Sequence, residues 1–458
     1  MSRIPLAGAW PAPITAVGLA LSASVALSPL SAHANPAADP AADLAALRGE
    51  IQAMRAAYEA RLQALEARLR MAEAQAAAPI AAAPPAAAPP VPPPIAAAAG
   101  ANAFNPAVSL ILSGQYASST RDPAGYRPGG VALPPGAELG PGSRGFSLGE
   151  SELGLAASID PWWRGAANIS LHADNTLSVE EAFVETTALG QGFTAKAGRF
   201  YSGVGYLNSQ HAHSWDFVDN PLAYQALLGT QFGQDGAQLR WLAPTDQFIE
   251  LGLELGRGRG YPGSDASRNG PGAVALTAHT GGDLGDSSNW RLGASMLRTV
   301  ASGQTLQLPA SDGGLTDLRF DGHTRVAVLD GIWKWAPGGN ATRTSFKLQG
   351  EWLRASRSGT LDGQPLPGGA GLTTSGWYLQ GVYQFMPHWR LGLRTERLRT
   401  DPQPERPRKD SLMLDWSASE FSRIRAQFAD DRARPGPADR QFTLQYQMSL
   451  GAHGAHSY

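Results

Sequence analysis

The sequence predicts an all-β chain, namely a 16-stranded antiparallel transmembrane β-barrel preceded by a short helical coiled coil and an Ala/Pro-rich linker. Three observations lead to this fold class. Apolar and polar residues alternate with a period of two, short connections alternate with long ones, and tryptophans gather near the short connections. We expect four parts: a signal peptide at residues 1–34, a periplasmic coiled coil at 35–75, a linker at 76–101 and the barrel at 102–458.

The composition excludes several other classes of protein. The chain has no Cys, so disulfides and thiolate metal sites are excluded, and this is compatible with an oxidising compartment. A net charge of -2 does not support a nucleic-acid partner. After the extreme N-terminus, no apolar run is long enough for a membrane-spanning helix.

The N-terminus has the pattern of an export signal. Arg3 precedes an apolar run over residues 14–30, and Ala32, His33 and Ala34 form an A-x-A site. A basic start, an apolar centre and small residues at the end predict a signal peptide cleaved after Ala34. A short membrane anchor is the alternative. Together with the predicted barrel, the signal peptide indicates that the protein lies in the outer membrane of a Gram-negative bacterium. Outer-membrane lipid is then one of its partners.

Residues 43–75 favour a helix whose apolar face is suited to self-association. Leucines and other apolar residues recur there at spacings of three and four. A lone amphipathic helix that docks on its own chain would show the same pattern. The Ala- and Pro-rich residues 76–100 form a semi-rigid spacer, so the coil is expected to be a separate unit. It could bind peptidoglycan or a periplasmic protein.

Strand patterns then repeat to the end of the chain. The 16 expected strands lie at residues 106–116, 146–159, 164–173, 179–188, 193–201, 237–242, 247–256, 272–281, 290–299, 323–335, 343–354, 374–385, 389–399, 410–417, 422–430 and 440–450. In each, one face is apolar and the other polar, as in a barrel with lipid outside and water inside. A soluble sandwich would also alternate, but with shorter strands.

The connections and the tryptophans distinguish the barrel from the sandwich. Seven short turns alternate with long connections such as residues 117–145, 202–236 and 300–322. Short periplasmic turns and longer outer loops are typical of outer-membrane barrels, which places both chain ends in the periplasm. Eight tryptophans lie near the short turns, as in an interfacial girdle: Trp162, Trp163, Trp241, Trp290, Trp333, Trp335, Trp389 and Trp416.

The long segment at residues 202–236 is expected to fold into the barrel and constrict it. Its candidate constriction residues are His211, His213, Asp216 and Asp219. Strand parity places nine Lys or Arg and eight Asp or Glu on the inner face, so the signs of the inner charges nearly cancel. The candidate pore-lining residues among them are Lys196, Arg240, Glu250, Glu254, Lys347, Glu351, Arg390, Arg394, Arg423 and Arg425. Because the segment carries no Lys or Arg, Asp216 and Asp219 are expected to favour cations weakly.

The architecture resembles that of the phosphate-selective porin family. Residues 196–241, KAGRFYSGVGYLNSQHAHSWDFVDNPLAYQALLGTQFGQDGAQLRW, are similar to the strand, inserted loop and strand that form the constriction in that family. The resemblance implies a homotrimeric passive channel. Phosphate selectivity is not carried over, since members select phosphate with basic residues that this loop lacks. The final strand and Tyr458 resemble the signal that the barrel assembly machinery recognises.

The expected function is a non-enzymatic channel for small hydrophilic solutes or ions, with no cofactor. One alternative is a tethering barrel with a closed pore. Another is a metal-binding or metal-uptake channel, in which His211 and His213, with Asp216, would bind a borderline metal. His453 and His456 offer similar ligands. No G-x-S-x-G or comparable nucleophile motif supports a hydrolase.

Overall fold

The computed structural model describes residues 106–451, except 138, 310–313, 367–371 and 402–403. The chain divides into two units, Met1–Ala97 and Ala98–Tyr458, and every described residue belongs to the second. The predicted signal peptide and coiled coil, the whole linker, and the tail with His453 and His456 therefore lie outside the described residues.

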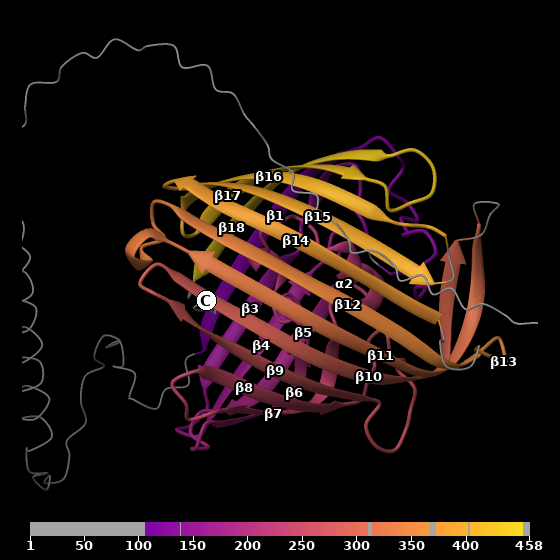
Figure 1. Ribbon diagram of the computed structural model, residues 1–458, viewed down its shortest axis with the longest axis horizontal. Helices are drawn as coiled ribbons and strands as arrows, with labels where there is room; N and C mark the ends of the chain where they lie inside the picture. Colours follow the sequence, from indigo (N-terminus) through magenta and orange to yellow (C-terminus); the bar gives the residue numbers. More distant parts are fainter. Residues whose placement is uncertain (1–105, 138, 310–313, 367–371, 402–403, 452–458) are drawn as a thin grey trace, which may run out of the picture. The chain divides into compact units, whose positions relative to one another are not determined.

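The described strands form one closed antiparallel barrel (Figure 1). The strands are β1 (Ala107–Ser119), β2 (Gly145–Leu148), β3 (Ser151–Ser158), β4 (Trp163–Leu171), β5 (Leu177–Thr186), β6 (Phe193–Tyr201), β7 (Gly233–Leu242), β8 (Phe248–Gly256), β9 (Ala273–Leu284), β10 (Ser288–Pro309), β11 (Leu315–Trp335), β12 (Ser345–Leu361), β13 (Gln364–Pro365), β14 (Leu372–Met386), β15 (Trp389–Asp401), β16 (Arg408–Ser419), β17 (Ser422–Asp431) and β18 (Asp439–Gly451).

Closure comes from the pairing of β1 with β18, which runs from Ser109↔Gly451 to Ser119↔Gln441. Both β2 and β3 pair with β1, so together they occupy one position in the barrel, and β13 is a two-residue segment beside the end of β12. The structure is thus a 16-stranded barrel, as predicted.

Burial along the strands is inverted relative to a soluble protein. In β18, Phe442 and Leu444 are exposed, whereas Gln441 and Thr443 between them are buried. The same alternation recurs around the barrel, with exposed leucines and aromatic residues outside and buried polar residues inside. An apolar outer surface of this extent is suited to lipid.

The connections alternate in length as expected, with one correction. The turns at residues 285–287 and 387–388 are short, and residues 202–232 form the longest connection. Residues 300–322 were expected to be a loop, but most of them extend β10 and β11, which pair as far as Pro309↔Leu315 with an irregularity between Ala301 and Gln304. None of the described helices combines the length and hydropathy needed to cross a membrane.

Residues 202–232 fold into the barrel and contain the short helices η1 (Ala212–Ser214) and α2 (Leu222–Leu228). Pro221 directly precedes α2, and Gly229 ends it in the left-handed conformation, with φ 63°. Every residue of α2 is buried, and the helix packs against β12, β14 and β15. Tyr126 and Leu133, from the connection after β1, join the same apolar cluster.

Candidate functional site

Three carboxylates on the inner wall anchor the folded-in segment, residues 202–232, which we call the inner loop. Glu254 accepts hydrogen bonds from Ser202 Oγ at 2.6 Å and Gly203 N at 2.8 Å. Glu351 accepts from Tyr206 N and Leu207 N, both at 3.0 Å. Both carboxyl groups are buried and each accepts at least two hydrogen bonds from the inner loop, so they hold it against the wall.

The third anchor, Glu396, holds the start of α2. Its Oε2 accepts a hydrogen bond from Leu222 N at 2.6 Å. An anion at this point satisfies one of the free backbone N–H groups of the first helical turn.

Asp216 of the inner loop lies between two basic side chains of the wall. Its carboxylate pairs with Lys347 Nζ, and its Oδ1 lies 3.5 Å from Arg390 Nη1. Gln380 Nε2 donates to Oδ2 at 3.0 Å. Burial by itself would raise the pKa of Asp216, but Lys347 and Arg390 lower it to about 2. The carboxylate is therefore ionised at neutral pH, and Lys347 and Arg390 offset its negative charge.

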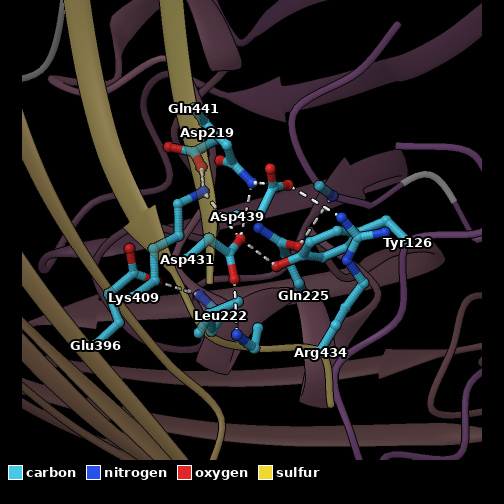
Figure 2. A network of polar contacts seen from close by, with 12 residues as sticks. Tyr126, Asp219, Leu222, Gln225, Glu396, Lys409, Asp431, Arg434, Asp439 and Gln441 are labelled. Carbon is cyan, nitrogen blue, oxygen red and sulfur yellow. Dashed lines mark hydrogen bonds and ion pairs between the residues drawn. The ribbon is translucent and has the colours of Figure 1, made fainter. Parts of the chain in front are cut away.

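Asp219 is held in the same way within a larger network (Figure 2). Its carboxylate pairs with Lys409 Nζ and, at 2.6 Å, with Arg394 Nη2. Burial would raise the pKa of Asp219, yet the two cations hold it well below its usual value. Lys409 also lies 3.8 Å from Asp431, which accepts a hydrogen bond from Tyr126 Oη at 2.7 Å. The network thus joins the inner loop, the wall and the connection after β1.

The expectation that Asp216 and Asp219 act as uncompensated negative charges is wrong. Their cations are supplied by strands far along the chain; Arg390 and Arg394 follow the aspartates by 174 and 175 residues. No cation occurs within the loop itself, so the loop sequence gave no sign of the pairing.

The other side of the inner loop meets carboxylates. His211 Nδ1 lies 3.2 Å from Glu152 Oε2 and 3.0 Å from Glu180 Oε2, and its Nε2 lies 2.9 Å from Glu181 Oε2. His213 Nδ1 lies 3.0 Å from Glu152 Oε2. Burial would lower the pKa of His211, but the hydrogen bonds to the three glutamates raise it well above its usual value.

The two histidines are therefore together, as the metal prediction requires, with ring centroids 5.7 Å apart. Asp216 does not join them, because it is held by Lys347 and Arg390. Parity assigns Glu152 to the inner face, but sequence reasoning missed Glu180 and Glu181 and did not bring any of the three to the histidines, since they come from β3 and β5.

The other predicted inner charges form pairs along the wall. Arg240 bridges Glu185 at 3.3 Å and Glu250 at 3.6 Å, and Lys196 lies 3.5 Å from Glu185. Arg425 lies 3.0 Å from Asp415. A further pair joins Arg390 to Asp415 at 3.1 Å. Arg423 donates to Gln447 Oε1 at 2.8 Å and to the carbonyl oxygen of His213.

A cavity of about 700 Å³ lies between the inner loop and the strands around the closure of the barrel. The inner-loop side includes His213, Trp215, Val218 and Asp219. The wall side is mostly uncharged and polar: Ser113, Gln115, Ser147, Gln427, Gln441, Thr443, Gln445 and Gln447. The ten charged residues predicted to line the pore lie elsewhere on the inner wall of the described barrel.

The amide and hydroxyl groups form a row across three neighbouring strands. Gln445 of β18 pairs with Gln115 of β1, which pairs with Ser147 of β2. Gln445 Oε1 and the hydroxyls of Ser113 and Ser147 have no hydrogen-bond partner among the described residues. Parity placed these residues on the inner face, but the sequence analysis followed charges and missed them. The alternation of glutamines in QFTLQYQ was the available signal.

The chain was compared with known families, sequences and structures. No protein-family model matches the chain. It is 29% identical over 341 residues to an uncharacterised protein of Aquifex aeolicus (strain VF5), covering 69% of this chain and 70% of that protein. An anion-selective porin from Comamonas acidovorans aligns with 76% of this chain and 100% of its own, at 11% identity and a TM-score of 0.49.

Another similar structure is a loop L8 deletion mutant of OmpT, an outer membrane protein of Vibrio cholerae, with the same coverage, identity and TM-score. The outer membrane channel DcaP of Acinetobacter baumannii covers 76% of this chain at 11% identity, with a TM-score of 0.45. These likenesses concern the fold of the barrel, so function has to be argued from the chain's own residues.

Proposed function

We propose that this protein is an outer-membrane channel for passive diffusion of small hydrophilic solutes, and that solutes pass between the inner loop and the wall strands β17, β18, β1 and β2. The observation that carries the proposal is the cavity of about 700 Å³ at this place. A loop that is held by the wall at several points and leaves such a cavity beside it narrows the lumen without filling it. The remaining passage is the constriction.

The lining favours neutral and weakly charged solutes over one ionic species. Amide and hydroxyl groups both donate and accept hydrogen bonds, so they replace water around sugars, amino acids or hydrated ions alike. Asp122 and Asp174 line the cavity with Arg144 as their positive counterpart. We therefore propose a weak preference for cations, carried by these two carboxylates in place of Asp216 and Asp219.

Single-channel recording in planar bilayers tests the path. Gln445→Trp places a bulky ring in the passage, whereas Leu444→Trp, its neighbour in sequence, changes the lipid-facing side of the same strand. We expect stepwise channels from the wild type, a conductance lower by roughly half or more in Gln445→Trp, and no change in Leu444→Trp. Equal conductance in the two variants would exclude this path.

The same recording separates the channel from the tethering alternative, in which the barrel is closed and the protein links the outer membrane to peptidoglycan or a periplasmic protein. A wild-type protein that inserts but never conducts would favour tethering.

Reversal potentials in a potassium chloride gradient measure the ion selectivity of the channel. We expect the double variant Asp122→Asn, Asp174→Asn to lose part of the cation preference.

The proposed assembly is a homotrimer joined in part by the coiled coil at residues 35–75. Apolar residues at spacings of three and four are buried only when helices meet. Deleting residues 43–75 should weaken the oligomer and leave the barrel folded. A full-length protein that is monomeric by light scattering in mild detergent would contradict this. Insertion by the barrel assembly machinery through the C-terminal strand also remains a proposal.

A further inference from the structure

His211 and His213 lie on the side of the inner loop that faces Glu152, Glu180 and Glu181, which we call the acidic side. The cluster there contains more potential metal ligands than the two histidines. Glu152, Glu180 and His211 each offer one ligand atom, and these three atoms lie within 4.8 Å of one another. His213 Nδ1 adds a fourth, 3.0 Å from Glu152 Oε2. The side chains of all four residues are at most 15% exposed. The cluster is therefore compact and shielded.

A strand irregularity turns two consecutive glutamates toward this cluster. In the pairing of β4 with β5, Asn168 faces Glu181 and Ile169 faces Val179, so Glu180 has no partner and forms a bulge. A bulge interrupts the alternation of side chains between the two faces of a strand. Glu180 and Glu181 consequently both reach the ring of His211.

We propose that these residues form a site for a divalent transition-metal ion, with zinc as the best fit. The ligands would be Nδ1 of His211, Nδ1 of His213 and one carboxylate oxygen each of Glu152 and Glu180. Nitrogen and oxygen ligands at about 2.0–2.2 Å in a tetrahedron lie roughly 3.3 Å from each other. Three of the ligand pairs already lie 3.2, 3.0 and 3.0 Å apart. Glu152, Glu180 and His211 are thus close enough to share one ion, and the ring of His213 would turn toward them to complete the site.

Glu181 supplies the outer shell that such a site requires. Its Oε2 lies 2.9 Å from Nε2 of His211, the ring nitrogen opposite the proposed ligand atom. A metal-binding histidine commonly donates its second ring N–H to a carboxylate, which fixes the tautomer and leaves the other nitrogen free for the metal. Asn168 Nδ2 also lies 2.9 Å from this nitrogen, so Asn168 and Glu181 together orient the ring with Nδ1 toward the ligand cluster.

The local charge also favours a cation. No Lys or Arg in the described part of the chain forms an ion pair with Glu152, Glu180 or Glu181. Glu185, which lies on β5 with Glu180 and Glu181, pairs instead with Arg164, Lys196 and Arg240. Imidazole together with carboxylate suits zinc and similar ions better than magnesium or calcium. The inference does not depend on the channel function.

Metal binding by the full-length protein tests the site. The protein would carry no histidine tag, and His453→Gln and His456→Gln would be present in every sample to remove the ligands of the tail. After chelator treatment and dialysis in detergent, zinc would be titrated and counted by elemental analysis, and cobalt would be used as a visible probe of tetrahedral coordination. We expect one equivalent per chain and the absorption bands of tetrahedral cobalt.

The variants distinguish one specific metal site from weak binding by histidines elsewhere on the protein. His211→Gln and Glu180→Gln should abolish the cobalt bands, and Glu181→Gln should weaken binding by about 10–100-fold. The control is His279→Gln, which disrupts another wall pair, His279 Nδ1 to Glu250 Oε1 at 3.2 Å, and should bind like its parent.

Circular dichroism and the unfolding midpoint would verify that each variant is folded; Glu181→Gln leaves all four ligands in place and tests the site should another variant fail to fold. A parent protein that takes up no saturable equivalent would overturn the proposal. So would a folded His211→Gln that binds as tightly as the parent.

Discussion

The two sides of the inner loop meet the barrel wall with opposite charge arrangements. On the basic side, Asp216 and Asp219 each pair with two cations of the wall. On the acidic side, His211 and His213 face glutamates that have no Lys or Arg partner in the described residues. The first side is a set of completed ion pairs that fasten the loop, whereas the second has negative charge left over and is suited to bind a cation.

The largest expected effect comes from removing one anion on the basic side. Asp219→Asn leaves Arg394 and Lys409, whose side chains are 1% exposed, without their shared partner. Breaking a buried pair at one end costs about 3–5 kcal/mol, and we expect a loss of this size in the free energy of unfolding. Tryptophan fluorescence during denaturant titration of the refolded barrel measures it.

The matched control for Asp219→Asn is Asp410→Asn, which disrupts an exposed pair with Arg397 at 3.0 Å. Exposed pairs contribute about 0–1 kcal/mol. Equal stability of the two variants would mean that the basic side does not fasten the loop.

A second effect is expected at the anchor that holds residues 206–207, ahead of both sides of the inner loop. Glu351→Gln puts an amide NH2 group where one carboxylate oxygen accepts from Tyr206 N, Leu207 N or Tyr224 Oη. We expect a loss of about 2–3 kcal/mol and noisier single-channel currents, because residues 206–207 can then leave the wall. Tyr378→Phe, which removes one further donor to Glu351, should cost about 1 kcal/mol. Quiet, unchanged currents in Glu351→Gln would contradict the anchoring role.

Acid should weaken the ion pairs of the basic side within a narrow pH range. The folded pKa of Asp216 is about 2, below the ordinary value of 3.8, so its ionised form stabilises the fold above pH 4. That stabilisation, about 2 kcal/mol, is lost as the pH falls from about 4 to about 2. Unfolding midpoints of wild type and Asp216→Asn across this range should converge at the acid end. A constant difference between them would show that Asp216 does not titrate there.

The smallest expected effect is on selectivity. Asp216→Asn uncovers Lys347 and Arg390, which are about a quarter exposed, and should shift the reversal potential slightly toward anions. The control is again Asp410→Asn, which lies outside the basic side and should leave the reversal potential in place. If Asp216→Asn also leaves it unchanged, the basic side is screened from the solute path.

Much of the barrel could be predicted because its rules are local. A side chain such as Leu444 or Gln445 is assigned to the lipid or the lumen by its parity, and turn lengths set the orientation of the strands. All 16 predicted strands are present, although β10 and β11 run further than expected. The inward position of the inner loop followed from its length between two clear strands.

The sequence by itself determined the fold class, the strand faces and the inner loop, since each depends on periods of a few residues. Only the tertiary structure decided the charges of the candidate site. Lys347 and Lys409 reach Asp216 and Asp219 from distant strands, and a one-residue bulge brings both Glu180 and Glu181 to His211. Coulomb energy depends on distance in space, which the order of residues along a closed barrel does not reveal.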